Sequence, residues 1–428
     1  MKLAEKSVNA ILAPLVRGLG LHASGEAIAV VPGPAEKTSG ALNADIGPAV
    51  RDGLIDEEAA AAILRDAAAQ AGQRLPSCAA IEAAGEPLGT YWMDRTLDAA
   101  RARAKREDPA PLSAAAPLPV TAALTAPSAA EGGHGKGNAA GEICPSGSSS
   151  RSRADVARNR IALVTGGAQG FGEEITRGLA ASGALVFIAD LNIKGAEELA
   201  EKINAALGKT SAIALALDVS REESAEQAVA AAAETAGGLD ILISNAGVLK
   251  AGSVLEQDVS SFAFTTGINY TGYFIMAKHG GRLMRRQNRN APFWKTDIIQ
   301  INSKSGLEGS NKNGAYAGGK FGGLGLTASF ALELIEYNIK VNAVCPGNFF
   351  DGPLWSDSEK GLFVQYLKAG KVKGAKTVAD VKTFYEEKVP MKRGCTGPDV
   401  MRAIYYIIEQ EYETGQAVPV TGGQVMLH

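Results

Sequence analysis

From about residue 159 onward, short apolar runs alternate with longer segments of helical period, and this alternation leaves few folds open to the chain. The apolar runs, whose length and branching are typical of buried strands, are 161–164, 185–189, 212–217, 241–244, 298–301 and 340–344. The segments of helical period between them are 171–182, 193–206, 221–236, 259–288 and 314–336. Strands that are each followed by a helix pair in parallel, with crossover helices on both faces of the sheet. We therefore predict an α/β fold with a doubly wound parallel sheet.

The turn after the first predicted strand is rich in glycine. Thr165 is followed by Gly166, Gly170, Phe171 and Gly172 in GxxxGxG spacing, and a predicted helix begins there. Glycine tolerates positive φ and close approach of the backbone to a ligand, and a helix N-terminus offers free N–H groups to a pyrophosphate. The cluster alone is also compatible with an ordinary tight turn, because the chain contains 50 glycines. Placed between a strand and a helix, it predicts a Rossmann-type dinucleotide site.

Two acidic residues follow the next two strands. Asp190 ends the second strand, where a carboxylate can bind both ribose hydroxyls of NAD and repels the 2′-phosphate of NADP. Leu191 follows, so no adjacent arginine is present to bind that phosphate; the alternative for Asp190 is an acid stabilised by a helix dipole. Asp218, followed by Val219, either meets the adenine or caps the helix that begins near Arg221. We predict NAD as the cofactor.

Tyr316 and Lys320 lie four residues apart in the last predicted helix and therefore share a face. Of the ten tyrosines, only Tyr316 has a lysine four residues later. A phenol with a pKa near ~10 is a poor base at neutral pH, but an adjacent ammonium favours the phenolate. An isolated pair of this kind more often consists of a packed tyrosine beside a solvated lysine.

Two polar residues lie where simple packing does not require them. Ser303 follows the strand "DIIQIN", whose carboxyl end is where open α/β sheets bind ligands, although serine is also common in turns. Asn269 falls inside the predicted helix 259–288, where asparagine is mildly unfavourable and often has another role.

In order and spacing, these features resemble the short-chain dehydrogenase/reductase family over about 270 residues. The resemblance adds Asn245 and Gly247 of the "NAG" triplet, and Pro346 and Gly347. It implies a cofactor surface made of Thr165, Gly166, Gly170, Phe171, Gly172, Asp190, Asp218, Val219, Asn245, Gly247, Tyr316, Lys320, Pro346 and Gly347. The threonine that often follows the Pro-Gly pair in the family is missing from "PGNFFDGP".

The resemblance also implies a catalytic role for four residues. Tyr316 is the general acid/base, and Lys320 binds the nicotinamide ribose and lowers the pKa of Tyr316. Ser303 orients the substrate oxygen, and Asn269 supports a water relay from Lys320 to solvent. Hydride passes between the substrate carbon and nicotinamide without a metal.

Several phrases resemble the sorbitol-6-phosphate 2-dehydrogenases within this family: "IIQINSKSG", "KFGGLGLTASFALELIEY", "VPMKRG" and "VTGGQVM". The substrate implied is a polyol phosphate, bound by Ser303, Tyr316 and Lys304, with Lys312, Lys392 and Arg393 as further cations for the phosphate. The alternatives are another polyol, a sugar acid, a 3-hydroxyacyl substrate, or a catalytically idle scaffold. The resemblance further suggests a homotetramer built through the helices 259–288 and 314–336.

The first part of the chain differs in composition. Residues 1–95 are Ala-rich, with helical stripes near 8–19 and 56–71, and are expected to be a small, mostly helical region. Residues 96–158 are rich in Pro, Ala, Gly and Ser and are predicted to be a flexible linker. This organisation suggests either a tethered module that docks on a partner, a sister subunit or a compartment shell, or a small degenerate domain with no present role. Removal of the region is expected to leave kcat and KM within a few-fold.

Composition excludes several other classes of protein. A net charge of -3 argues against a dedicated nucleic-acid binder. Four scattered cysteines and four histidines indicate no disulfide framework and no metal site. No apolar stretch of ~20 residues predicts a membrane span, and no signal peptide is evident, so a cytoplasmic location is expected.

Overall fold

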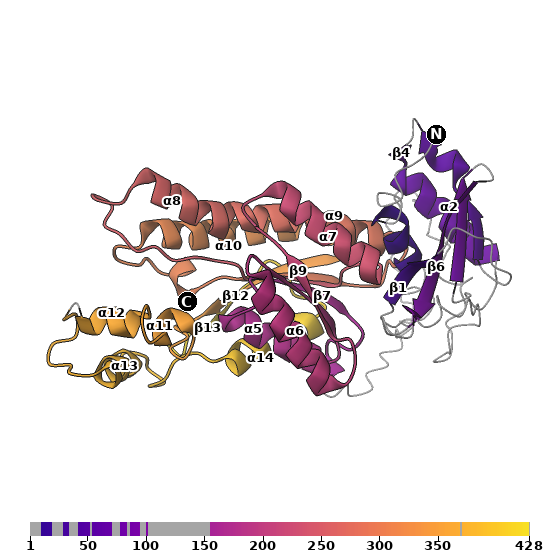
Figure 1. The fold of residues 1–428 in the computed structure, drawn as a ribbon. Coiled ribbons are helices and arrows are strands. Elements are labelled where there is room, and N and C mark those ends of the chain that lie inside the picture. The colour runs from indigo at the N-terminus through magenta and orange to yellow at the C-terminus, as the bar shows by residue number, and fades with distance from the viewer. Residues whose placement is uncertain are drawn as a thin grey trace, which may run out of the picture.

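The structure is a computed structural model that describes residues 10–18, 29–33, 42–51, 54–70, 78–83, 86–94, 100–101, 155–368 and 370–427. Figure 1 shows a sheet between two layers of helices, with a smaller N-terminal unit at one end of it. The predicted linker falls largely on residues 102–154, which lie outside the described residues.

The large sheet has seven parallel strands in the order β13-β12-β11-β10-β7-β8-β9. Its strands are β7 (Ile161–Thr165), β8 (Leu185–Asp190), β9 (Ala212–Ala216), β10 (Ile241–Ser244), β11 (Thr296–Ile301), β12 (Ile339–Pro346) and β13 (Ala417–Val420). Every residue of β7, β8, β10, β11 and β12 is buried, as expected for parallel strands covered on both faces. The doubly wound α/β prediction is confirmed, and the edge strand β13 is an addition to the six predicted strands.

Helices cover both faces of this sheet (Figure 1). One layer contains α5 (Gly170–Ala181), α6 (Ile193–Leu207) and α14 (Gly397–Glu409). The other contains α7 (Glu222–Ala236), α9 (Gly272–Asn288) and α10 (Gly314–Leu334). Each layer closes its own hydrophobic core against the sheet. The carboxyl ends of β7, β11 and β12 therefore emerge at one edge between the layers, where a ligand site is expected.

The predicted continuous helix 259–288 is wrong in one respect. It consists of α8 (Val259–Thr266), a π-helical turn η3 (Gly267–Thr271) and α9. At the centre of η3 the Asn269 side chain binds the backbone of Val248 in a neighbouring loop. A π turn inside a helix is frequent at functional sites, and helical periodicity does not reveal it.

A small helical subdomain, called the cap here, follows β12. It contains α11 (Pro353–Ser356), α12 (Leu362–Lys368) and α13 (Val378–Glu387). The cap has its own core, in which Phe350, Trp355 and Phe363 are buried against one another. It is therefore a separately packed unit next to the carboxyl edge of the sheet.

The N-terminal unit is mixed α/β, so the prediction of a mostly helical region holds only in part. Residues 10–18 are helical and α2 is Glu57–Gln70, close to the two predicted stripes. A four-stranded sheet accompanies them, with β1 (Ala29–Gly33), β6 (Glu86–Asp94), β5 (Cys78–Ala83) and β2 (Leu42–Asp45) in that order. The short elements η1 (Gly47–Ala49), β3 (Val50–Arg51) and β4 (Leu54–Ile55) complete it. Pairing between strands far apart in the sequence forms this sheet, and short Ala- and Gly-rich segments carry little local β signal.

The N-terminal unit packs against the large sheet at the amino ends of its strands. Arg17 donates to both carboxylate oxygens of Asp240 at 2.9 and 2.8 Å, and both side chains are fully buried. Ala291 and Trp294, in the turn after α9, belong to the hydrophobic core of the N-terminal unit. An added Cβ on Gly18 would lie 2.2 Å from the Gln287 carbonyl oxygen, so the two parts are in close backbone contact.

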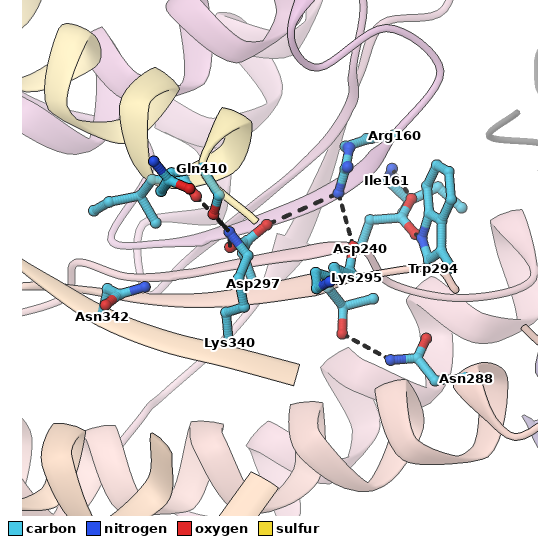
Figure 2. Close-up of polar contacts among 12 residues, drawn as sticks. Arg160, Ile161, Asp240, Asn288, Trp294, Lys295, Asp297, Lys340, Asn342 and Gln410 are labelled. Carbon is cyan, nitrogen blue, oxygen red and sulfur yellow. Dashed lines mark hydrogen bonds and ion pairs between the residues drawn. The ribbon is translucent and has the colours of Figure 1, made fainter. Parts of the chain in front are cut away.

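Buried charges extend along these amino ends (Figure 2). Asp240 also accepts from Trp294 Nε1 and from the backbone N–H of Ile161, the first residue of β7. Asp297 forms a buried ion pair with Lys340 at 2.9 Å and lies 3.8 Å from Arg160. Burial raises the pKa of Asp297, although Lys340 and Arg160 act in the opposite direction. These charges lie at the opposite edge of the sheet from the carboxyl ends, and they are structural.

Candidate active site

The glycine loop has a shape that only glycine permits. Gly166 and Gly170 have φ of +60° and +58°. A Cβ on Gly172 would lie 1.9 Å from the Gly166 carbonyl oxygen, and one on Gly166 would lie 3.0 Å from the Ala246 Cα. Within the described residues, no side chain caps the start of α5 at Gln169. The loop therefore leaves a backbone cradle at a helix N-terminus, and this geometry fits a dinucleotide pyrophosphate.

The "NAG" triplet forms hydrogen bonds with the start of this loop. Thr165 Oγ1 accepts from the backbone N–H groups of Asn245 and Ala246 at 3.0 and 2.9 Å. Asn245 Nδ2 donates to the carbonyl oxygens of Thr165 and Gly166, both at 3.0 Å. Four hydrogen bonds thus connect the ends of β7 and β10, and both motifs lie at one site.

Asp190 faces the same loop from the end of β8. Its carboxylate accepts from the backbone N–H groups of Ala168 at 3.0 Å and Asn192 at 2.9 Å. Leu191 beside it is 78% exposed. The carboxylate is thus positioned by the loop at the end of β8, where the ribose of a dinucleotide is expected.

Asp218 and Val219 follow β9. The Asp218 carboxylate accepts from the Ser220 N–H and hydroxyl at 3.0 and 2.6 Å. The N-cap of α7 is Arg221, which makes no side-chain cap, so Asp218 stabilises the turn before the helix and not its first turn. Val219 is buried against Gly272 at the start of α9.

Ser303, Tyr316 and Lys320 meet at the carboxyl end of β11. Ser303 begins the short helix η4 (Lys304–Gly306), and Tyr316 and Lys320 lie in the first two turns of α10. The Lys320 ammonium lies 5.7 Å from the Tyr316 ring centroid and donates to the Ile301 carbonyl oxygen at 2.8 Å. The expectation that Tyr316 and Lys320 share a helix face is met in this geometry.

Burial dominates the electrostatics of these groups. It raises the pKa of Tyr316, and a hydrogen bond with the Ser303 side chain acts in the opposite direction. Burial also lowers the pKa of Lys320 to about 8, while nearby Cys345 acts in the opposite direction. The charged form of Lys320 is therefore less strongly favoured than that of an exposed lysine.

Asn269 and Gly247 lie beside Lys320. A Cβ on Gly247 would be 3.2 Å from Asn269 Oδ1 and 3.9 Å from Lys320 Nζ, so these groups surround one small space. The Asn269 amide binds the N–H and the carbonyl oxygen of Val248, each at 2.8 Å. The asparagine therefore ties the loop after β10 to η3, next to Lys320 of α10.

Comparisons with known proteins match this part of the chain. The family model of the short chain dehydrogenases matches residues 160–360. Sorbitol-6-phosphate 2-dehydrogenase of Escherichia coli (strain K12) is 37% identical over 270 residues, which are 63% of this chain and 99% of that protein. Trans-4-hydroxycyclohexanecarboxylate dehydrogenase of Sinomonas cyclohexanicum is 40% identical over 198 residues, 45% of this chain and 74% of that protein. The solved structure of sorbitol-6-phosphate 2-dehydrogenase SrlD from Erwinia amylovora is 38% identical, with a TM-score of 0.57, and covers 62% of this chain and all (100%) of that one.

The chain belongs to the short-chain dehydrogenase family. It is thus an oxidoreductase that acts on CH–OH groups, and dehydrogenases of this family use NAD or NADP. The fold, the glycine loop and the order of the motifs agree with this membership.

An aromatic contact joins the segment after Gly347 to the glycine loop. The ring of Phe349, in "PGNFFDGP", stacks on Phe171. The ring centroids are 4.4 Å apart and the planes differ by 14°. This contact, and not a threonine side chain, lies next to the glycine loop in this segment.

The four cations suggested for a phosphate differ in their surroundings. Lys304 is half-buried beside Ser303, whereas Lys312 is exposed. Lys392 Nζ donates to the Glu387 carbonyl oxygen, and Arg393 forms two hydrogen bonds with the Asp399 carboxylate at 2.6 and 3.1 Å. Arg393 also lines a cavity of about 450 Å³, together with Asp399, Arg402 and the backbone of residues 419–423. Asp399 neutralises Arg393, whereas Lys304 adjoins Ser303 in the chain.

Sequence reasoning missed Asn302 and Cys345. The Asn302 amide donates to the Lys320 carbonyl oxygen at 2.9 Å, and its oxygen accepts from the Ser303 N–H at 2.8 Å. It thereby fixes the strand end that carries Ser303 to the catalytic helix. Cys345 lies close to Lys320, and burial raises its pKa to about 12, so it is an uncharged thiol. Asn302 precedes a motif residue directly, which is the only signal in the sequence.

Among the described residues, no group of three or more His, Cys, Asp or Glu side chains is arranged to bind a metal ion. In the same part of the chain, no helix is long and apolar enough to cross a membrane.

Proposed function

We propose that this chain is an NAD-dependent dehydrogenase that oxidises a secondary alcohol of a polyol phosphate, sorbitol 6-phosphate, to the ketone fructose 6-phosphate. The observation that carries the chemistry is the meeting of Ser303, Tyr316 and Lys320 next to the glycine cradle. The substrate is inferred from the sorbitol-6-phosphate 2-dehydrogenases, which match the chain at 37% and 38% identity over nearly their whole lengths. A cytoplasmic location remains a prediction.

In the proposed reaction, the Ser303 hydroxyl orients the substrate hydroxyl and Tyr316 removes its proton. NAD, when bound, supplies the hydride acceptor, so that alcohol and NAD give ketone, NADH and one proton. Burial raises the pKa of Tyr316 and the hydrogen bond with the Ser303 side chain lowers it. The Lys320 ammonium, 5.7 Å from the Tyr316 ring centroid, is a nearby positive charge of the kind that favours a phenolate. Asn269 holds the loop beside Lys320 in register, where a water relay would carry the proton to solvent.

The carboxylate of Asp190 predicts a preference for NAD. A 2′-phosphate near a fixed carboxylate is disfavoured by several kcal/mol, so kcat/KM with NAD should exceed that with NADP by at least about tenfold. Because Asp190 also accepts hydrogen bonds from the Ala168 and Asn192 N–H groups, Asp190→Asn is a better variant than Asp190→Ala. Asp190→Asn should lower the ratio of kcat/KM with NAD to kcat/KM with NADP, because it removes the negative charge. Its amide oxygen still accepts one hydrogen bond. Steady-state kinetics with both cofactors test this, and equal use of NADP by the unmodified chain would contradict it.

If the chain binds the phosphate group of its substrate, kcat/KM should be higher for sorbitol 6-phosphate than for sorbitol. A hydrogen bond to a charged group contributes about 1.5–3 kcal/mol, which corresponds to about ten- to hundredfold in kcat/KM. Lys304→Gln should remove most of this difference by lowering kcat/KM for the phosphate ester only. Lys392→Gln is the matched control, because its ammonium is bound to the Glu387 carbonyl oxygen. Comparable kcat/KM for both polyols would reject the phosphate site.

We also propose that the chain assembles as a homotetramer through the helices 259–288 and 314–336. Large apolar side chains are exposed along this face, and they include Val259, Phe262, Phe274, Phe321 and Leu332. Exposed large apolar side chains on neighbouring helices favour a protein contact. Light scattering should give a mass about four times that of the 44.2 kDa chain. A monomer in solution would be incompatible with this assembly.

A further inference from the structure

Two adjacent aromatic side chains after Gly347 contact different parts of the molecule. Phe349 stacks on Phe171, the second residue of α5, with ring centroids 4.4 Å apart. Phe350 is buried in the core of the cap, where its ring is 5.0 Å from that of Trp355 in an edge-on arrangement. The dipeptide therefore connects the glycine loop directly to the core of the cap.

The backbone around Phe349 is held on three sides. Gly347 N–H donates to the Val420 carbonyl oxygen at 2.9 Å, and Asn348 accepts from the Cys395 N–H at 2.8 Å. The turn after Phe349 closes with a bond from the Gly352 N–H to the Phe349 carbonyl oxygen at 3.1 Å. A Cβ on Gly352 would lie 2.5 Å from the Phe349 ring, so a glycine is needed for the chain to pass flat over it. The ring has little freedom to move independently of this backbone.

The cap also begins directly over the glycine loop. The first residue of α11, Pro353, places its Cδ 3.9 Å from where a Cβ of Gly170 would be. Gly170 and Phe171 form the N-terminal turn of α5, whose free N–H groups fit a pyrophosphate. A ligand that orders this turn therefore acts on Phe171, on Phe349 stacked against it, and through Phe350 on the cap.

We propose that Phe349 is a positioning residue that couples dinucleotide binding at the glycine loop to the order of the cap beside the substrate site. The inference rests on the proposed function, because it requires that the loop binds a nicotinamide dinucleotide. Cofactor is expected to bind first and to prepare the site for the polyol.

Hydrogen exchange with NADH as the probe tests the coupling without turnover. In the unmodified chain, saturating NADH should slow amide exchange in α11, α12 and α13 as well as in the glycine loop. Phe349→Ala should bind NADH about two- to tenfold more weakly, the effect of losing one aromatic pair. When saturated with NADH, this variant should protect the glycine loop but not the cap. Its KM for the polyol should rise more than its kcat falls.

Matched variants separate the coupling from general damage to the cap. Phe349→Tyr retains a ring that can stack and should restore protection, and Phe349→Leu serves if the alanine variant does not fold. Phe384→Ala removes a half-buried ring from α13 that packs on Tyr385, and should leave the response to NADH intact. Full cap protection by NADH in Phe349→Ala, or in Phe349→Leu if the alanine variant does not fold, would overturn the inference. Failure of the unmodified chain to bind NADH would overturn the proposed function and the inference with it.

Discussion

Tyr316→Phe should abolish most of the turnover of this dehydrogenase and leave NADH binding nearly unchanged. The substitution removes one hydroxyl at the end of β11, beside Ser303 and Lys320, and preserves the ring. Loss of a general acid/base typically costs about 10²–10⁴-fold in kcat. Kinetics with sorbitol 6-phosphate and fluorescence titration with NADH measure the two effects separately. A variant with near-normal kcat would show that Tyr316 is not the acid/base.

The pH profile provides an independent check on the same group. Burial raises the pKa of Tyr316, and burial lowers the pKa of Lys320 to about 8. Because oxidation of an alcohol requires the deprotonated base, kcat/KM for oxidation should rise with pH through an ionisation in the neutral to alkaline range. Reduction of the ketone requires the protonated acid and should fall over the same range. This opposite dependence should disappear in the residual activity of Tyr316→Phe.

Arg17→Met should lower the free energy of unfolding by about 3 kcal/mol or more, because it leaves a buried carboxylate without its ion partner. Burial by itself would raise the pKa of Asp240, but the charge and hydrogen bonds of Arg17, with Arg160 and the Ile161 N–H, hold the pKa below its ordinary value.

The structure therefore changes the expectation for the N-terminal region. Its removal is now expected to destabilise the dehydrogenase, since it supplies Arg17 and covers Ala291 and Trp294. Catalysis at low temperature should stay within a few-fold, because Asp240 lies at the amino end of β10, opposite the active site.

The pH dependence of this destabilisation follows from the sign of the shift. A carboxyl whose folded pKa is lowered contributes stability above its unfolded pKa and loses it as the pH falls. Without Arg17, burial raises the pKa of Asp240, so the stability deficit should be largest at neutral pH and smaller in acid. Denaturant unfolding at several pH values measures it, and Asp240→Asn in the Arg17→Met background should recover part of the loss. The control is Arg158→Met, because the ion pair of Arg158 with Asp155 lies at the surface. Equal, small losses in both arginine variants would show that the N-terminal unit is only loosely placed.

The sequence by itself determined the α/β class, six of the seven large-sheet strands, the glycine turn after β7, and the shared helix face of Tyr316 and Lys320. These features depend on interactions between near neighbours. Burial on both faces makes parallel strands apolar throughout, a strand-to-helix turn at a phosphate site demands glycine, and four residues make one turn of a helix. Spacing predicted that Tyr316 and Lys320 share a helix face, and the place of Gly166 and Gly172 after a strand predicted the tight turn; the catalytic roles came from the family resemblance.

Tertiary structure alone decided the features that join distant parts of the chain. In the π turn, the Asn269 side chain hydrogen-bonds to the Val248 backbone. The Phe349 ring stacks on Phe171, which lies far away in the sequence. Arg17 and Asp240 are 223 residues apart, and no periodicity in either segment predicts that they pair. A buried charge or an extra ring is stabilised only by the partner that the fold brings to it. Local pattern can therefore show that such a residue is unusual, but only the packed structure shows which group it meets.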